Sequence, residues 1–145
     1  MKGLPMLQEA IISMHSVHDY DNENADSMDF STDGFYSFEE GVGCMTYMES
    51  EITGMEGTRT SVFVMPDRVI VDRDGSITSR MEFAEGEKSS FLYNTPFGRA
   101  TLGIRTRRID RSFDENGGKV TIDYVVDMNH AVATRNRFSI EVRNA

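Results

Sequence analysis

RVIVDRDGSITSRMEF, residues 68–83, is the stretch of sequence that decides the fold class. Two short runs rich in β-branched residues flank the dipeptide Asp74-Gly75, which suits a tight hairpin turn with positive φ. In the second run Ile77, Met81 and Phe83 alternate with polar residues, as on a strand that buries one face. The stretch therefore predicts two antiparallel strands joined by a hairpin.

Runs of the same kind continue along the chain, separated by turn signals such as Asn116-Gly117 and Thr95-Pro96-Phe97-Gly98. The acidic stretch Asp19–Asp33 is interpreted as a solvated loop, and a short strand is expected directly after it. We expect strands at Leu7–His18, Gly34–Phe38, Cys44–Ile52, Thr58–Met65, Arg68–Arg73, Ser76–Phe83, Lys88–Thr95, Arg99–Phe113, Lys119–Met128 and Ala133–Val142.

This pattern predicts an all-β fold made as an antiparallel up-and-down meander. Val, Ile and Thr number 31 and Leu and Ala number 11, a ratio typical of strands rather than helices. A sheet of this size in a short chain closes on itself, which also removes exposed edges. We therefore expect a closed β-barrel of about 8–10 strands, forming a single domain over residues 1–145, in which the first strand pairs with the last.

Composition and charge indicate which partners and which cellular compartment to expect for this barrel. The net charge of −9 argues against a nucleic-acid partner. No apolar run is long enough for a membrane-spanning helix, and the start of the chain does not resemble a secretory signal. The single cysteine, Cys44, excludes an internal disulfide, so we expect a cytoplasmic protein.

Strand alternation places a polar minority on the inner face of the barrel. Val69 and Val71 share a face with Arg73, and Ile122 and Val126 share a face with Tyr124, because side chains two apart point the same way. The candidate interior site obtained in this way comprises Arg73, Glu49, Tyr47, Tyr93, Tyr124, Thr60, Thr106 and Asn136.

Two interpretations of this interior set are open. In one, Arg73 pairs with Glu49, hydroxyl groups complete a network, and the barrel is filled by its own side chains. In the other, Arg73 and the tyrosines face a cavity and hold the anionic head of a partly apolar ligand. The second interpretation predicts a binding protein for a small amphiphilic or anionic ligand.

The uneven charge supports an alternative function. Residues 1–58 carry a net charge of −11 and residues 59–145 a net charge of +2. Complementary sectors of this kind can dock two copies of a chain, so a ligand-free interaction module, as a homodimer, is the alternative.

Sequence motifs for catalysis or metal binding do not stand out. The acidic segment from Asp19 to Asp29 departs from a calcium-binding loop, because Asn24 stands where glycine is needed and Phe30 where the closing glutamate is needed. Phosphate-binding loops, dinucleotide fingerprints and nucleophile elbows do not occur. We therefore expect no enzyme activity, no metal site and no cofactor.

Several segments resemble a known family in their order and spacing. They are Tyr47-Met-Glu49, Gly54-Met-Glu-Gly57-Thr58-Arg-Thr60, Arg73-Asp-Gly75, Met81-Glu-Phe83, Tyr93-Asn-Thr95-Pro96-Phe97-Gly98, Thr106 with Ile109, and Ile122-Asp-Tyr124. From about residue 44 onward the chain resembles the YwiB-like family of small, uncharacterised bacterial proteins, found mainly in Gram-positive bacteria. The resemblance implies a calycin-like, lipocalin-type antiparallel barrel, a fold that often binds apolar or amphiphilic ligands inside, and it implies no established activity.

Overall fold

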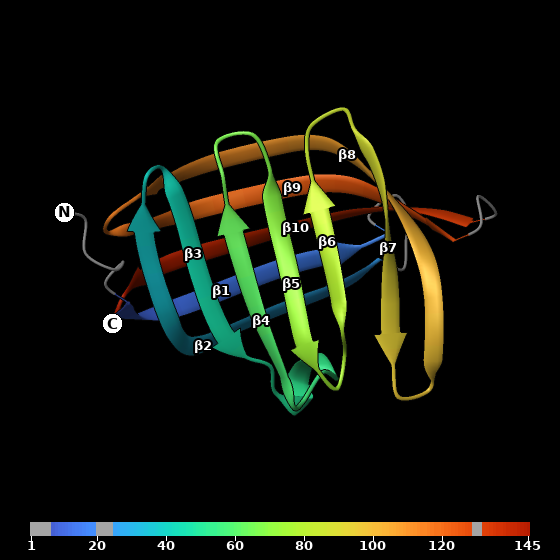
Figure 1. Ribbon diagram of the computed structural model, residues 1–145, viewed down its shortest axis with the longest axis horizontal. Coiled ribbons are helices and arrows are strands. Elements are labelled where there is room, and N and C mark those ends of the chain that lie inside the picture. Colours follow the sequence, from blue (N-terminus) through green and yellow to red (C-terminus); the bar gives the residue numbers. More distant parts are fainter. Residues whose placement is uncertain (1–6, 20–24, 129–131) are drawn as a thin grey trace.

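The computed structural model describes residues 7–19, 25–128 and 132–145, which form ten strands and one short 3-10 helix (Figure 1). No helix within these ranges is both long enough and apolar enough to cross a bilayer. The elements in chain order are β1 (Gln8–His18), β2 (Asp26–Glu39), β3 (Val42–Met48), η1 (Glu51–Thr53), β4 (Thr58–Val64), β5 (Val69–Gly75), β6 (Ser79–Phe83), β7 (Lys88–Thr95), β8 (Gly98–Asp114), β9 (Gly117–Met128) and β10 (Val132–Asn144).

The strands form one antiparallel meander that closes on itself. Their order in the sheet is β6-β5-β4-β3-β2-β1-β10-β9-β8-β7, so the first strand pairs with the last, as expected. The two ends of the sheet are joined by a bridge between Thr78 and Asn94, whose backbone N–H groups each donate to the other residue's carbonyl at 3.0 Å. The predicted all-β meander barrel is thereby confirmed.

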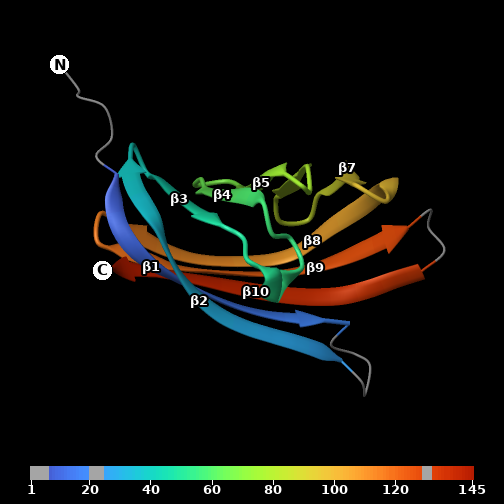
Figure 2. The same ribbon diagram turned by 90° about the horizontal axis from the view of Figure 1, so that it is seen from below.

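The barrel is flattened into two curved layers. Figure 2 shows β3, β4 and β5 lying across from β8, β9 and β10, with β1 and β2 beside β10. Apolar side chains from both layers fill most of the space between them, including the fully buried Met45, Val62, Ile122 and Ile140.

The prediction of an acidic loop over Asp19–Asp33 is wrong for the second half of this range, because β2 already begins at Asp26. Phe30 and Met28, the latter still 38% exposed, line a pocket of the barrel, whereas Asp29 faces outward and pairs with His15 of β1. The alternation of a strand is therefore present, but the density of acidic residues hides it. Residues 20–24 of the expected loop lie outside the described part of the chain.

The strand β2 carries the chain from one layer to the other. Its residues from Asp26 to Tyr36 pair with β1, and those from Phe35 to Glu39 pair with β3. At the corner stands Gly34, where a Cβ atom would lie 2.5 Å from the backbone oxygen of Thr46 and 2.5 Å from Cδ1 of Ile12. The glycine is required here because the bend brings neighbouring backbone too close for a side chain.

The connection between β3 and β4 differs from the expectation of a strand reaching Ile52. The strand ends at Met48, and Ser50 caps the short helix η1 by accepting a hydrogen bond from the backbone N–H of Ile52 at 3.3 Å. Gly54 ends η1 in the left-handed conformation, with φ of 76°. The connection consequently folds compactly at one end of the barrel (Figure 1).

Candidate ligand-binding cavity

A row of polar side chains crosses the inner face of the layer formed by β3 to β6. Tyr47 lies opposite Thr60, Thr60 lies opposite Arg73, and Arg73 lies opposite Ser79. Tyr47, Thr60 and Ser79 are buried, and the Arg73 side chain is 16% exposed. This arginine row, named for Arg73, runs beside a fully apolar row that begins with Met45.

A second polar row lies on the opposite layer. Asn136 of β10 is opposite Tyr124 of β9, which is opposite Thr106 of β8. Asn136 and Thr106 are buried and Tyr124 is half-buried. The sequence pattern predicted these inward orientations, because each residue keeps step with apolar neighbours two positions away.

Glu49, directly after β3, is held by hydroxyl groups. Its Oε2 accepts a hydrogen bond from Thr60 at 2.6 Å, and its Oε1 lies 3.2 Å from the hydroxyl of Thr53, which shares its single proton with the carbonyl oxygen of Ser50 at 3.1 Å. Its side chain is 1% exposed. Burial of a carboxylate is costly, and hydrogen bonds and a nearby positive charge both offset that cost, so these contacts hold Glu49 and the β3–β4 connection in place.

Arg73 faces the same carboxylate with few partners of its own. Its Nε lies 3.9 Å from Glu49 Oε2, which makes an ion pair but no hydrogen bond, and this nitrogen is buried without a hydrogen-bond partner in the described part of the chain. Its Nη1 donates to the thioether sulfur of Met81 at 3.6 Å. A guanidinium carries five N–H donors, and a thioether is a weak acceptor, so Arg73 retains donor capacity.

A cavity of about 240 Å³ lies next to Arg73 and Glu49 inside the barrel. The interior is therefore not filled by side chains alone, although the adjacency of Arg73 and Glu49 agrees with the first interpretation of the polar set. The lining residues are Met14, Ser16, Met28, Phe30, Glu49, Thr53, Met55, Val71, Arg73, Met81, Phe83, Tyr124, Phe138 and Ile140.

The tyrosines beside this cavity are held in their neutral form. Burial raises the pKa of Tyr124 to about 12, against a smaller lowering by the charge of Arg73. Burial and then the Glu49 carboxylate raise the pKa of Tyr47 well above its ordinary value. The Tyr47 hydroxyl and the Ser79 hydroxyl have no hydrogen bond of normal geometry in the described part of the chain, so with Arg73 Nε the arginine row contains three such buried polar atoms.

The structure divides the eight predicted site residues into three groups. Arg73, Glu49 and Tyr124 line the cavity. Tyr47 and Thr60 stand in the arginine row next to Glu49. Tyr93, Thr106 and Asn136 face inward or pack against the core but do not line the cavity.

Asn136, one of these three, has a structural role that its buried position explains. Its Oδ1 accepts a hydrogen bond from the backbone N–H of Asp19 at 3.0 Å, and its Nδ2 donates to Thr134. The side chain therefore ties the end of β1 to β10 instead of facing a ligand.

Sequence reasoning missed the cavity residues from the first two strands and from the β3–β4 connection. Met14 and Ser16 were detectable, because they alternate with Ile12 on β1, but Met28 and Phe30 fell in the expected loop. Thr53 and Met55 lie beyond the end of the expected strand Cys44–Ile52, and no local signal indicated that this connection folds over the interior.

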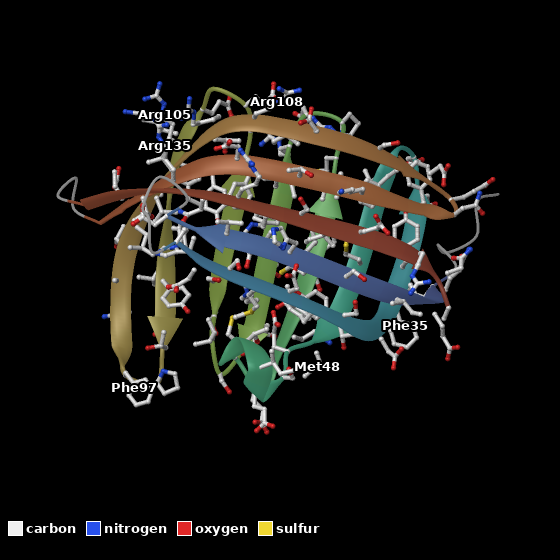
Figure 3. The ribbon with its side chains drawn as sticks, turned by 180° about the vertical axis from the view of Figure 1, so that it is seen from behind. Phe35, Met48, Phe97, Arg105, Arg108 and Arg135 are labelled. Carbon is white, nitrogen blue, oxygen red and sulfur yellow. The ribbon has the colours of Figure 1, made fainter. Side chains whose placement is uncertain are left out.

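The outer surface of β7 to β10 carries a row of cationic side chains. Lys88 and Arg105 are opposite each other, and Arg105 and Arg135 are both opposite Val125. Figure 3 shows Arg105 and Arg135 close together, with Arg108 farther along the same surface. This cationic row lies on the outside of the barrel, away from the cavity.

Comparison with known proteins gives consistent matches over most of the chain. Residues 12–140 match the family described as Domain of unknown function (DUF1934). The chain is 31% identical over 121 residues to the uncharacterized beta-barrel protein YwiB of Bacillus subtilis (strain 168), covering 82% of this chain and 83% of the relative. The crystal structure of the ywiB protein from Bacillus subtilis superposes with a TM-score of 0.84 and 23% identity, covering 96% of this chain and 93% of the other. These matches agree with the resemblance noted from the sequence motifs.

Proposed function

The chain belongs to the DUF1934 family of YwiB-like β-barrel proteins, and we propose that it is a binding protein that holds a small, partly apolar anion in the cavity beside Arg73. The proposal is one of binding, not catalysis. We also propose that the barrel is calycin-like, as the sequence resemblance implies. We further propose that the protein acts in the cytoplasm, because Cys44 is a free thiol.

The observation that carries the proposal is the incomplete pairing of Arg73. Its guanidinium cannot lose its charge inside the barrel. Within the described chain it has an ion-pair contact to Glu49 without a hydrogen bond, and a hydrogen bond to the sulfur of Met81. On the side away from Glu49, Nη1 has only this weak thioether acceptor among the described residues, and a carboxylate is the acceptor that matches a guanidinium best.

Glu49 does not fill this role itself. Its Oε2 already accepts a hydrogen bond from Thr60, its Oε1 lies within hydrogen-bond distance of the Thr53 hydroxyl, and it approaches Arg73 on the Nε side. The Nη1 side of Arg73 faces Met81 of the cavity wall. A guanidinium is a planar group with two edges, so one edge can compensate Glu49 while the other binds an anion from the cavity.

The size of the cavity limits the ligand. A volume of about 240 Å³ is slightly below the ~300–1,000 Å³ common for small-molecule sites. The apolar part of the lining is larger than the polar part, with ten of the fourteen lining residues being Met, Phe, Tyr, Val or Ile. A short organic acid matches both properties.

The test is calorimetric titration with hexanoate and with its uncharged analogue hexanamide. We expect the wild-type protein to bind hexanoate at least about tenfold more tightly than hexanamide, since a charge-assisted hydrogen bond is lost with the amide. The variant Arg73→Met should lose this preference. The control Arg59→Met, an exposed arginine on the neighbouring strand β4, should keep it. Equal binding of acid and amide by the wild type, or no binding of either, would refute the proposal.

The alternative is an interaction module whose cationic row docks on the acidic sector of a second copy. The alignment of Lys88, Arg105 and Arg135 across three strand pairs favours it. Light scattering at low and high salt tests it, because exposed charge pairs weaken with ionic strength. A dimer that dissociates in high salt and is weakened by Arg105→Glu supports docking, and a monomer at every concentration in low salt counts against it.

A further inference from the structure

The chemistry of the cavity wall narrows the class of ligand beyond an organic acid in general. Four of the fourteen lining residues are methionines and four are aromatic, whereas only Val71 and Ile140 are aliphatic and branched. The chain has ten methionines in all, so a large share of them meets at this one cavity. Thioether and aromatic groups are polarizable, and they contact aromatic rings more favourably than they contact saturated hydrocarbon.

One side of the cavity is a fixed set of rings. Phe83, Tyr124 and Phe138 contact one another edge-to-face, with ring centroids 5.0 to 5.8 Å apart and interplanar angles of 69° to 76°. They come from β6, β9 and β10, so the contact joins the two layers of the barrel. Each ring restrains the other two, and the three therefore present a preformed aromatic wall.

Four further residues of the lining are adaptable methionines. Met14, Met28, Met55 and Met81 come from β1, β2, the β3–β4 connection and β6. Unbranched methionine side chains rearrange around a ligand at low energetic cost. A preformed aromatic wall combined with adaptable thioethers suits a flat ring that fits between them.

The anion contact lies close to this aromatic wall. Arg73 Nη1 donates to Met81, and Arg73, Met81 and Tyr124 all line the same cavity. A ligand whose carboxylate reaches Arg73 therefore has its next few carbon atoms beside Tyr124 and Met81, which leaves room for a short linker only.

We infer that the cavity prefers a compact aryl carboxylate, in which an aromatic ring is joined to the acid by a short linker. This inference rests on the proposed anion site, and it adds that the apolar part of the ligand is an aromatic ring. Burial of hydrocarbon alone would favour a saturated ring, which has the larger apolar surface. The contacts with sulfur and rings favour the aromatic one.

The experiment compares 3-phenylpropionate with 3-cyclohexylpropionate, which has the same skeleton and carboxylate but no π-system, and with 3-phenylpropanamide, which lacks the charge. We expect the dissociation constant of 3-phenylpropionate to be about tenfold lower than that of each analogue. The variant Met14→Leu, at a lining methionine of β1, should reduce the preference for the phenyl over the cyclohexyl acid and leave the preference for acid over amide in place. Met45→Leu, on the same inner face but outside the lining, is the control.

The possible failures are distinguishable. Equal or tighter binding of the cyclohexyl acid would overturn the aryl inference while leaving the anion site intact. Equal binding of the phenyl acid and the amide would overturn the anion site. Binding of none of the three compounds would overturn both. Thermal unfolding of each variant, measured beforehand, shows whether a lost preference reflects the cavity or a loss of folding.

Discussion

The Nε of Arg73 lies 3.9 Å from Oε2 of Glu49, within reach of an ion pair and beyond reach of a hydrogen bond. The carboxylate is nevertheless hydrogen-bonded, because Thr60 donates to it and the Thr53 hydroxyl lies within hydrogen-bond distance of it. The two charges compensate each other while each keeps a different set of contacts. Glu49 therefore positions Arg73 without accepting a hydrogen bond from it, and the donors of Arg73 stay available.

This relationship predicts the effect of Arg73→Met on stability. If Arg73 were needed only to balance Glu49, its removal would strand a buried carboxylate at a cost of about 3–5 kcal/mol. Because Glu49 keeps its hydroxyl contacts, we expect the free energy of unfolding in urea to fall by less than this, while hexanoate binding is lost. The contrary outcome has two parts: Arg73→Met lowers the free energy of unfolding by the full range of about 3–5 kcal/mol, and the double variant Arg73→Met with Glu49→Gln regains most of that stability. This outcome would show that the pair fills the barrel and serves no ligand.

The hydroxyl of Thr60 is expected to matter more to stability than its size suggests. Thr60→Val keeps the shape but removes the 2.6 Å hydrogen bond to the buried Glu49, which should lower the free energy of unfolding by about 1.5–3 kcal/mol. The control is Thr46→Val, which removes a neutral 3.2 Å contact to Ser61 at a half-buried position. Equal losses in the two variants would mean that the Glu49 carboxylate does not depend on Thr60.

Ionisation of the tyrosines should report the integrity of the interior. Burial raises the pKa of Tyr36 and of Tyr124 to about 12, from an ordinary value of 10.0, and it also raises the pKa of Tyr47. The unfolded chain releases these protons at lower pH than the folded chain does. The stabilisation from the neutral phenols is therefore complete below about pH 10 and is lost as pH rises toward about 12.

Absorbance at 295 nm measures this titration directly. We expect three of the five tyrosines to resist ionisation above pH 10 until the barrel unfolds, and Tyr124→Phe should remove one of the three. Ionisation of all five near pH 10, with the far-ultraviolet circular dichroism unchanged, would contradict the burial of these phenols.

The corner in β2 gives a prediction about the fold itself. In Gly34→Ala the new Cβ would meet the backbone oxygen of Thr46, which cannot move away without disturbing β3. We expect a loss of about 1–3 kcal/mol in the free energy of unfolding. In Gly103→Ala the nearest atoms belong to the side chain of Asp127, which can rotate, so the loss should be smaller. A larger loss at Gly103 than at Gly34 would show that the bend does not depend on Gly34.

The closed meander could be predicted from the sequence because its signals are local. Val69, Val71 and Arg73 on one face, followed by a turn, define a strand pair without reference to the rest of the chain. The same period of two residues predicted the inward direction of Thr60, Arg73 and Tyr124. The beginning of β2 was lost because acidic residues on its outer face dominate the composition, although Met28 and Phe30 keep the alternation.

The cavity could be predicted only in part, because its walls come from elements far apart in the sequence. Alternation shows that Tyr93 and Asn136 face inward or toward the core. It does not show that the Asn136 side chain accepts a hydrogen bond from the backbone N–H of Asp19. It also carries no information about Met55, since the β3–β4 connection folds over the interior through the capping of η1. Strand alternation shows which polar side chains point inward. The closure of the barrel determines which of them lie in the same cavity.

The most direct test of the anion site is a crystal structure of the protein grown with hexanoate well above its measured dissociation constant. We expect the ligand inside the barrel, with a carboxylate oxygen about 2.7–3.2 Å from a terminal guanidinium nitrogen of Arg73 and its chain against Met81 and Tyr124. A cavity that holds only water, or hexanoate bound elsewhere while Arg73 keeps its contacts with Glu49 and Met81, would contradict the role assigned to Arg73.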